Sequence, residues 1–275
     1  MDATERLSMT RLDEADAADG LKLSSEAHWN QNEADWRFFL RRGIVFGLRD
    51  RDRHAVATAA LLPYTDTDAW ISMVLVTESF RRRGLATRLV DACLTNAAGQ
   101  GLTTWLDATP AGAAVYGPLG FTPTIQLRRL RLENSSAAKE NAPLPAGQPN
   151  DLITCDTNAM GFSRRDLLNE LIKRPGSRLV SNGDATALLR EGRIARHIGP
   201  LFADSPAQAL AMVRDIAAGE TRPLIIDAVA TQDIFLTGLT NAGWSIERPF
   251  QRMRLGRAAS QPTELPFAVA GPEYG

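Results

Sequence analysis

The sequence is poor in the residues that build disulfide frameworks and metal centres. It has two cysteines and three histidines in 275 residues. Cys93 and Cys155 have no ligand spacing, so neither a disulfide framework nor a cysteine-based metal centre is expected. Cys93 falls on the apolar side of a predicted helix, where a buried thiol is the ordinary state. We therefore predict no metal site.

Charge of one sign and long apolar runs are also missing. The 31 basic and 32 acidic side chains leave a net charge of −1, so no overall field attracts nucleic acid. No run of eighteen apolar residues predicts a membrane span, and the polar start of the chain is unlike a signal peptide. We expect a cytoplasmic protein without a nucleic-acid or membrane partner. The hydrophobic content of 44% and the length suit two soluble domains.

A strand–loop–helix pattern is the most informative stretch of the chain. An apolar run from Trp70 to Val76 leads into a basic loop, and an amphipathic helix starts near Leu85. The N–H groups of a helix start point to one spot that suits a phosphate. In the loop, Gly84 and the small Ala86 permit close approach of an anion. A solvated basic turn is the alternative interpretation.

A second motif follows downstream, where Tyr116 precedes the pair Gly120-Phe121. Together, the Arg81-x-x-Gly84-x-Ala86 loop and this tyrosine motif resemble the GCN5-related N-acetyltransferases, the GNAT superfamily. The resemblance implies an acyltransferase with acetyl-CoA as acyl donor. It implies a mixed α/β fold (α+β mixed sheet), a central sheet flanked by helices in each of two tandem domains.

The resemblance also assigns roles to residues. Tyr116 would be the acid that protonates the departing thiolate, and the alternative is that its ring only packs under the donor. The donor-binding set is Val74, Leu75, Val76, Arg81, Arg82, Arg83, Gly84, Leu85, Ala86 and Thr87. In this set, strand amides would bind the pantetheine arm and the loop would bind the pyrophosphate. No general base is assigned, because Asp66, Asp68 and Glu78 are only nearby acids and a water chain would also serve.

The acceptor region has two interpretations. In the family, the connection between the first two helices borders the acceptor pocket, and here it contains Trp29, Asn30, Gln31 and Asp35. These would form a polar-aromatic acceptor site. Alternatively, the tryptophans Trp29 and Trp36 are core residues and the polar groups are helix caps.

The elements can be placed by periodicity and by turn residues. Asn32 is a predicted N-cap for a helix that ends at Gly43. The predicted strands cover 7–11, the two arms of a hairpin over 44–64, 70–76, 102–106 and 124–132. The strand at 102–106 should run parallel to the one at 70–76, because a helix crosses between them. A shift in alternation predicts a bulge near Arg128.

The second half of the chain repeats the first in outline. The pair Gly243-Trp244 precedes Leu255 by the same spacing as Gly120-Phe121 precedes Leu132. Upstream, Ile226-Asp227-Ala228 is similar to Leu106-Asp107-Ala108. The repeat carries no arginine-glycine loop. Asp204 or Ser205 caps a helix there instead, so we predict a degenerate copy that does not bind CoA.

These features predict the domain plan. Residues 1–134 form an N-terminal GNAT domain, 135–150 a linker, 151–256 a degenerate GNAT-like domain and 257–275 a tail. The tail is expected to be disordered, with docking onto the protein as the alternative. The predicted activity is N-acetyl transfer to the primary amine of a small molecule. A non-catalytic acyl-CoA-binding module and a protein-lysine acetyltransferase are the alternatives, and the sequence predicts no oligomeric state.

Overall fold

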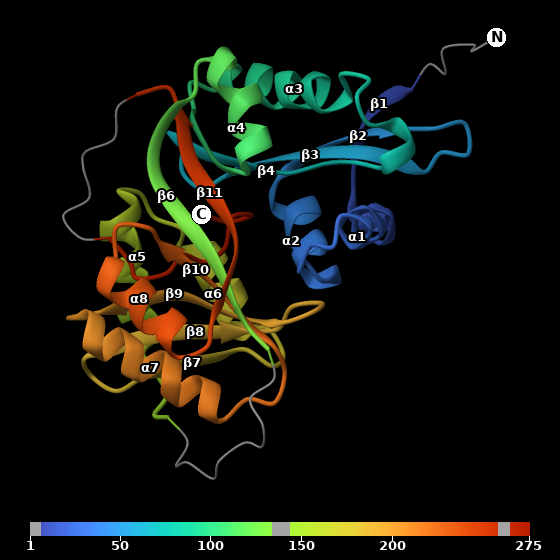
Figure 1. Cartoon of the computed structure of the whole chain (residues 1–275). Helices are drawn as coiled ribbons and strands as arrows, with labels where there is room; N and C mark the ends of the chain where they lie inside the picture. Colours follow the sequence, from blue (N-terminus) through green and yellow to red (C-terminus); the bar gives the residue numbers. More distant parts are fainter. Residues whose placement is uncertain (1–6, 134–143, 258–264) are drawn as a thin grey trace. The chain divides into compact units, whose positions relative to one another are not determined.

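The computed structural model describes residues 7–133, 144–257 and 265–275. Their contacts divide the chain into two compact units, the first ending at Leu106 and the second starting at Asp107 (Figure 1). The central part of the predicted linker, residues 134–143, lies outside the described residues, as do residues 258–264 of the predicted tail. In the described part of the chain, no helix is both long and apolar enough to span a membrane.

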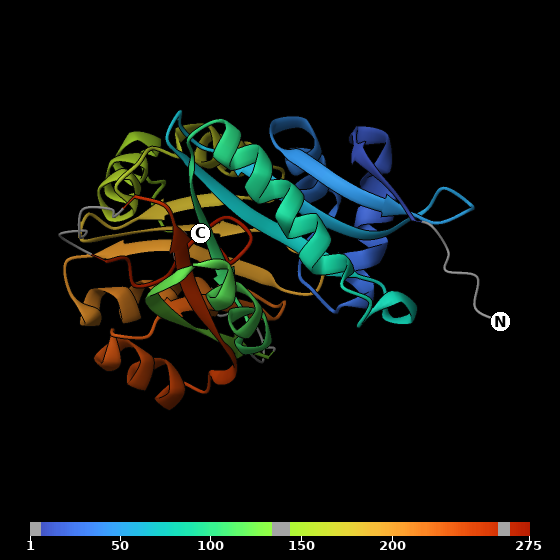
Figure 2. The ribbon, with the colours of Figure 1, turned by 90° about the horizontal axis from the view of Figure 1, so that it is seen from above.

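The first unit is a mixed sheet between two helical layers. Its strands are neighbours in the order β1 (Ser8–Leu12), β2 (Ile44–Arg49), β3 (Ala55–Pro63), β4 (Asp68–Val76) and β5 (Thr103–Ala108). Only the β4–β5 pair is parallel, as predicted. The helices α1 (Ala17–Glu26) and α2 (Glu33–Arg42) cover one face, and α3 (Leu85–Gly99) covers the other (Figures 1 and 2). The short helix Glu14–Asp16 precedes α1.

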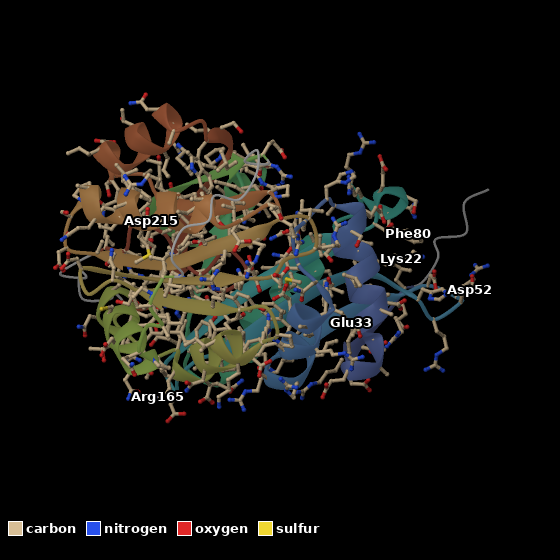
Figure 3. All side chains as sticks on the ribbon, turned by 90° about the horizontal axis from the view of Figure 1, so that it is seen from below. Lys22, Glu33, Asp52, Phe80, Arg165 and Asp215 are labelled. Carbon is tan, nitrogen blue, oxygen red and sulfur yellow. The ribbon has the colours of Figure 1, made fainter. Side chains whose placement is uncertain are left out.

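Local sequence signals account for the second helix of this unit. Asn32 is its N-cap and forms a reciprocal capping box with Asp35, as the cap rule predicts. Trp36 and Phe39 are buried on one stripe, and Gly43 terminates the helix. The opposite side is polar and exposed, with Glu33 paired to Arg37 one turn later (Figure 3). The predicted N-cap, stripe and stop are confirmed.

The second unit also contains a mixed sheet. Its strand order is β11 (Ser245–Leu255), β6 (Thr122–Leu132), β10 (Leu224–Val229), β9 (Arg196–Ala203), β8 (Ala185–Arg190) and β7 (Arg178–Ser181). Its helices are α4 (Pro110–Tyr116), the short Gly117–Leu119, α5 (Pro149–Met160), α6 (Arg165–Lys173), α7 (Pro206–Ala218) and α8 (Asp233–Asn241). A helix crosses between the parallel strands β9 and β10, as α3 does between β4 and β5.

The repeat seen in the sequence appears as two reciprocal ion pairs. The long strands β6 and β11 are the repeated segments and lie side by side, antiparallel (Figure 1). Asp107 accepts two hydrogen bonds from Arg252 of β11, both at 2.9 Å. Asp227 of β10 accepts two from Arg129 of β6, at 2.8 and 2.7 Å. Each copy therefore supplies the arginine that pairs with the aspartate of the other.

The contacts of residues 107–132 divide the chain at a different point from the predicted domain boundary. Contacts group residues 107–132 with the second unit, whereas the sequence placed the boundary after residue 134. The reason is that β6 pairs with both β10 and β11, which are formed by residues about a hundred positions later. The predicted linker is also shorter at its C-terminal end, since Ala146 already bridges to Val180 and α5 starts at Pro149.

Two further predictions need correction. The bulge expected near Arg128 is not there, because β6 pairs with β10 without interruption from Leu127 to Leu132. The register shifts between β6 and β11 lie between Pro123 and Gln126 of β6, and at Glu247 of β11, which is the extra residue opposite Leu130 and Arg129. The described part of the tail, residues 265–275, is docked and largely buried, so the alternative prediction holds for this segment.

Candidate active site

The basic loop and the start of α3 form an open anion site in the first unit. Gly84 is the N-cap of α3 with φ of 72°, a left-handed conformation that favours glycine. No side chain caps the helix, and the first turn hydrogen bond runs from Arg88 N to Gly84 O. The amides of the first helical turn therefore have no helical acceptor. No atom would contact a Cβ at Gly84, so this point is open to a ligand.

The arginines around this helix start keep their charges free of ion pairs. In the described part of the chain, Arg81, Arg82, Arg83 and Arg88 contact no carboxylate closely enough for a salt bridge. Arg81 Nε donates to Val76 O at 3.1 Å, which folds the loop back onto the end of β4. Arg83 lies 4.9 Å over the ring of Phe80, a loop residue labelled in Figure 3. Four exposed cations beside free amides favour a polyanion such as a pyrophosphate.

The strand that leads to the loop carries a bulge that the sequence did not reveal. Between the pairs Thr58–Leu75 and Ala60–Ser72, β4 contains one residue more than β3. Met73 takes up the excess with φ of 52°, and the buried Thr58 Oγ1 donates to its carbonyl at 2.8 Å. A bulge bends its strand.

Beyond this point β4 and β5 no longer pair. Their parallel register covers only Asp68–Trp70 with Thr103–Trp105, so the later part of β4 pairs with no described residue of β5. Thr77 N donates to Val56 O. Because bonded and non-bonded pairs alternate along an antiparallel ladder, Val76 directs its N–H away from β3, while Leu75 directs its own toward β3. Val76 is thus better oriented than Leu75 for the predicted amide role.

Glu26 is a residue of this site that the sequence analysis missed. It ends α1 and accepts hydrogen bonds of 2.5 Å from Thr77 Oγ1 and from Glu78 N, just before the arginine loop. The bond from Thr77, with that from Glu78, lowers the pKa of the Glu26 carboxyl. Its partners lie more than fifty positions away, so no local pattern indicates the contact. Glu26 positions the loop relative to α1.

The residues of the predicted acceptor region fall into two groups, those with a structural role in the cap and core and those in the connection between α1 and α2. The carboxylate of Asp35 is engaged in the capping box of α2, and Trp36 is fully buried with its Nε1 donating to Ser24. The cap-and-core interpretation describes these two. Asn30 is buried and Trp29 half-buried in the connection between α1 and α2. Gln31 is buried, and its Oε1 has no hydrogen-bond partner among the described residues.

Ser72 of β4 is a second buried group with an unpartnered oxygen. No described residue bonds to its Oγ. Phe46 faces α3 across a surface hollow and is paired with Ala59. The next residue, Ala60, points to the opposite face and is paired with Ser72. Ser72 therefore faces the α1–α2 side, the side on which Gln31 lies.

Tyr116 belongs to the second unit, at the end of α4. Thr109 caps this helix by accepting from Gly112 N at 3.3 Å. The Tyr116 ring is half-buried and lies 5.8 Å from that of Phe121. Gly120, with φ of 94°, closes the segment as predicted. The motif is therefore locally ordered, and the catalytic role of Tyr116 stays a prediction.

The second copy lacks the loop chemistry, as predicted. Ser205 caps α7 by accepting from Gln208 N, so a side chain already occupies the helix start. No arginine stands in the preceding turn, which reads Phe202-Ala203-Asp204. Pro206 has no N–H and Ser205 occupies that of Gln208, so this helix start offers an anion fewer free amides than α3 and no arginine in the preceding turn.

The interior of the second unit instead holds a buried charge cluster. Arg129, Asp227 and His197 are all buried, and His197 Nε2 lies 2.9 Å from Asp227 Oδ2. Burial opposes ionisation of Asp227, but the charge of Arg129 and the hydrogen bond from His197 outweigh it, so its pKa lies below the ordinary value. Burial and the charge of Arg190 lower the pKa of His197.

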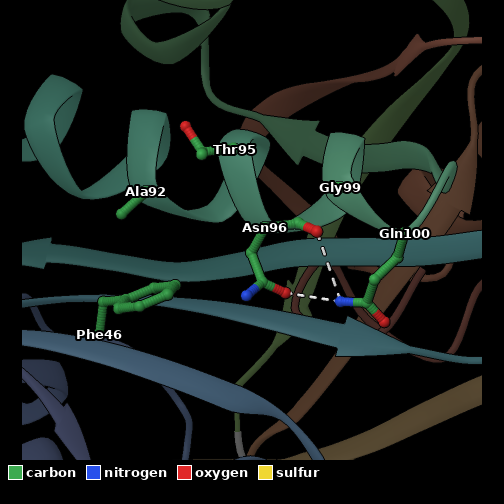
Figure 4. Close-up of a pocket in the computed structure, with 6 residues that line it drawn as sticks. All are labelled: Phe46, Ala92, Thr95, Asn96, Gly99 and Gln100. Atoms are coloured by element: carbon green, nitrogen blue, oxygen red, sulfur yellow. Dashed lines mark hydrogen bonds between the residues drawn. The ribbon is translucent and has the colours of Figure 1, made fainter.

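A hollow at the far end of α3 carries no catalytic chemistry. Its volume is about 600 Å³, and its lining residues are Phe46, Ala92, Thr95, Asn96, Gly99 and Gln100 (Figure 4). Gln100 Nε2 donates to Asn96 Oδ1 at 2.6 Å within it. The lining includes no charged group or general base that would activate the Thr95 hydroxyl or transfer a proton.

The diverging parallel strands, the bulge and the open helix start together define a mixed-sheet fold with an open helix start beside a divided sheet. Residues 10–121 match the acetyltransferase (GNAT) family, and residues 152–268 match an acetyltransferase (GNAT) domain. The chain belongs to the GNAT superfamily and contains two of its domains. The predicted family, fold class and tandem organisation are confirmed.

Individual relatives agree with this assignment. The uncharacterized N-acetyltransferase YitH of Bacillus subtilis is 25% identical over 238 residues, which cover 82% of this chain and 83% of that protein. A putative acetyltransferase from Pyrococcus horikoshii has a TM-score of 0.80 at 20% identity, covering 100% and 98% of the two chains. A tandem GNAT protein from the clavulanic acid biosynthesis pathway has a TM-score of 0.64 at 14% identity, covering 93% and 100%. The last two similarities concern the fold alone.

Proposed function

We propose that the protein transfers the acetyl group of acetyl-CoA to the primary amine of a small molecule. The observation that supports the donor is the uncapped start of α3 at Gly84, surrounded by arginines that form no salt bridge with any described residue. A nucleotide pyrophosphate matches this site in charge and in its need for N–H donors. Arg81 to Thr87 would hold it, and the outward-facing amide of Val76 would donate to the pantetheine arm or the thioester carbonyl.

The chain's own groups would supply the proton transfers. The donor brings an activated thioester, and the amine must attack it in its neutral form. Tyr116 donates its hydroxyl proton to the departing thiolate, an assignment that rests on the motif. Among the nearby acids, Asp68 is an unsuitable base, because Oδ1 and Oδ2 accept hydrogen bonds from Trp105 and Thr67. Water is then the simplest route for the amine proton.

The acceptor is proposed to bind on the α1–α2 side of β4. Gln31 Oε1 and Ser72 Oγ are buried acceptor atoms without described partners, and each would accept a hydrogen bond from an ammonium or amine group. Buried contacts suit a ligand that enters the fold whole, which favours a small molecule over a protein chain. Gln31→Leu and Ser72→Ala should raise KM for the amine and leave KM for acetyl-CoA unchanged.

Thiol release from acetyl-CoA over a panel of small amines and lysine peptides tests the proposal. We expect turnover with a small amine, and a fall of roughly 10²-fold or more in kcat for Tyr116→Phe, the usual scale for a lost general acid. Tyr64→Phe, in the turn before β4, is the matched control. If wild type and Tyr116→Phe both bind acetyl-CoA without turnover, the protein is a non-catalytic binding module. Turnover with lysine peptides alone would indicate a protein acetyltransferase.

A further inference from the structure

The second unit holds an extended segment of its own chain between two strands. The parallel strands β9 and β10 pair only from Arg196 to Ile198 with Leu224 to Ile226, and then separate. Ala268 forms antiparallel bridges both to Leu201 of β9 and to Ala228 of β10. The residues 265–275, called here the tail segment, thus fill the gap between the two strands.

Backbone hydrogen bonds join the tail segment to both walls of this gap. Leu201 N donates to Ala268 O at 2.9 Å, and Phe267 N donates to Leu201 O at 2.9 Å. On the other wall, Val229 N donates to Phe267 O at 3.1 Å and Val269 N donates to Asp227 O at 3.0 Å. Pairing of this kind is how a sheet binds an added peptide strand.

Side chains anchor the segment in apolar surroundings. Phe267 lies 5.2 Å from the ring of Phe235, at a steep interplanar angle, within the main core of the unit. Val269 packs in a small cluster with Leu127, Val229 and Phe250. The approach is close, because a Cβ at Gly199 would stand 2.0 Å from Val269 O. A side chain at position 199 would therefore displace the segment.

Two buried arginines clamp the end of the segment. Arg190 Nη2 donates to Ala270 O at 2.5 Å and to Glu273 Oε1 at 2.8 Å. Arg164 Nη1 donates to Tyr274 O and Gly275 O, at 2.6 and 2.5 Å, while Asp156 holds its other side. Glu273 supplies the negative charge that pairs with Arg190 inside the protein. Without the segment, Arg190 would lose this described carboxylate partner.

The gap has a counterpart in the first unit. There β4 and β5 pair over three residues each and then separate beside the anion loop. In the sequence repeat, β10 corresponds to β5, through Ile226-Asp227-Ala228 and Leu106-Asp107-Ala108. The tail segment therefore lies in the second copy's equivalent of the cleft proposed to hold the acyl donor; only this equivalence rests on the proposed function.

We propose that the cleft of the second copy is a peptide-binding groove, and that the tail segment is its ligand. The groove binds an extended peptide as an added strand between β9 and β10. It selects apolar side chains at the positions of Phe267 and Val269. It also requires an acidic residue at the position of Glu273, which pairs with Arg190. The copy that lost the anion loop has kept the cleft and uses it for a segment of the same chain.

The direct test separates the groove from its ligand. A chain ending after residue 264 is titrated calorimetrically with a synthetic peptide of residues 265–275, and hydrogen exchange is followed at the amides of Leu201 and Val229. We expect these amides to exchange at least roughly tenfold faster without the segment. The peptide should bind one per chain and restore protection, and peptides carrying Phe267→Ala or Glu273→Gln should bind more weakly. No peptide binding by a folded shortened chain overturns the proposal.

Full-length variants keep the test decisive if the shortened chain does not fold. Phe267→Ala and Glu273→Gln should each speed exchange at Leu201 and Val229, while Glu133→Gln, at an exposed site, should not. Wild-type protection in both tail variants would overturn the proposal. Neither measurement involves acetyl-CoA or turnover, so its failure is distinct from a failure of the proposed activity.

Discussion

Gly84 is the residue on which the proposed donor site depends most closely, and Gly99 of the same helix allows a direct comparison. Both Gly84 and Gly99 have open space at the position of a Cβ, but only Gly84 has a positive φ. Gly84→Ala should therefore cost about 1 kcal/mol or more in backbone strain and displace the amides from the anion. Gly99→Ala, at the last residue of α3, should be neutral or stabilising.

Acetyl-CoA affinity measured calorimetrically checks this expectation. Gly84→Ala should bind the donor several-fold more weakly than Gly99→Ala, and its melting temperature should be lower. Equal affinities in the two variants would mean that the donor does not use the start of α3.

His197 gives the second unit a defined response to pH. Its folded pKa is lowered by burial and by Arg190, so near the unfolded value of about 6.5 the unfolded chain binds the proton and the folded chain does not. The contribution of the neutral His197 to the free energy of unfolding is therefore fully present above about pH 6.5. As the pH falls below this value, the free energy of unfolding declines by at most about 1.4 kcal/mol per pH unit. The lowered pKa of Asp227 adds a loss with the same sign below about pH 4.

Urea unfolding between pH 7.5 and 5.5 measures this dependence. His197→Gln should reduce the slope of stability against pH. A wild-type stability that is constant or rises toward pH 5.5 would show that His197 is not held neutral.

At the scale of elements, Glu26 connects α1 to the anion loop, and two substitutions separate its effects. Glu26→Ala removes both hydrogen bonds to Thr77 and Glu78, and should raise the Kd for acetyl-CoA roughly 2- to 10-fold through a looser loop. Glu26→Gln removes the charge near Arg81 but keeps an acceptor oxygen, so its affinity should equal or exceed that of wild type.

The matched control for this pair is Glu33→Ala, which removes an exposed glutamate of α2. Calorimetric titration of all four proteins gives the comparison. If Glu26→Ala binds the donor as tightly as Glu33→Ala does, the link between α1 and the loop has no role in binding.

Elements were predictable where their signals are local. The cap at Asn32, the β2–β3 hairpin and the parallel β4–β5 pair follow from neighbouring residues or from the crossing helix. The bulge at Met73 was not predictable, because every residue from Met73 to Val76 is apolar and any of them suits the register. The contact of Glu26 was hidden for another reason, since it depends on how α1 packs against β4.

On the scale of the whole molecule, each of the two ion pairs joins an arginine from one copy of the sequence repeat to an aspartate from the other copy. Arg129 and Asp227 are buried, so Asp227→Asn leaves a buried guanidinium without its carboxylate and should cost about 3–5 kcal/mol. Glu133→Gln, which changes an exposed partner of Arg131, should cost less than about 1 kcal/mol.

Adding Arg129→Met to Asp227→Asn should recover most of the lost stability, because the unpaired guanidinium is removed and His197 keeps a polar partner at position 227. Urea unfolding provides the free energies. Equal costs for Asp227→Asn and Glu133→Gln would contradict a structural role for the exchanged pair. The sequence revealed the repeat but not this exchange, which arises only when β6 inserts between β10 and β11.

We propose that each chain has one acyl-donor site, formed by β4 and the start of α3. Calorimetric titration with acetyl-CoA tests it most directly. We predict one equivalent bound per chain, with binding weakened by Arg81→Ala and by Gly84→Ala, and unaffected by Arg214→Ala on the exposed side of α7. Two equivalents per chain, or one equivalent that is unaffected by both loop variants, would contradict the account.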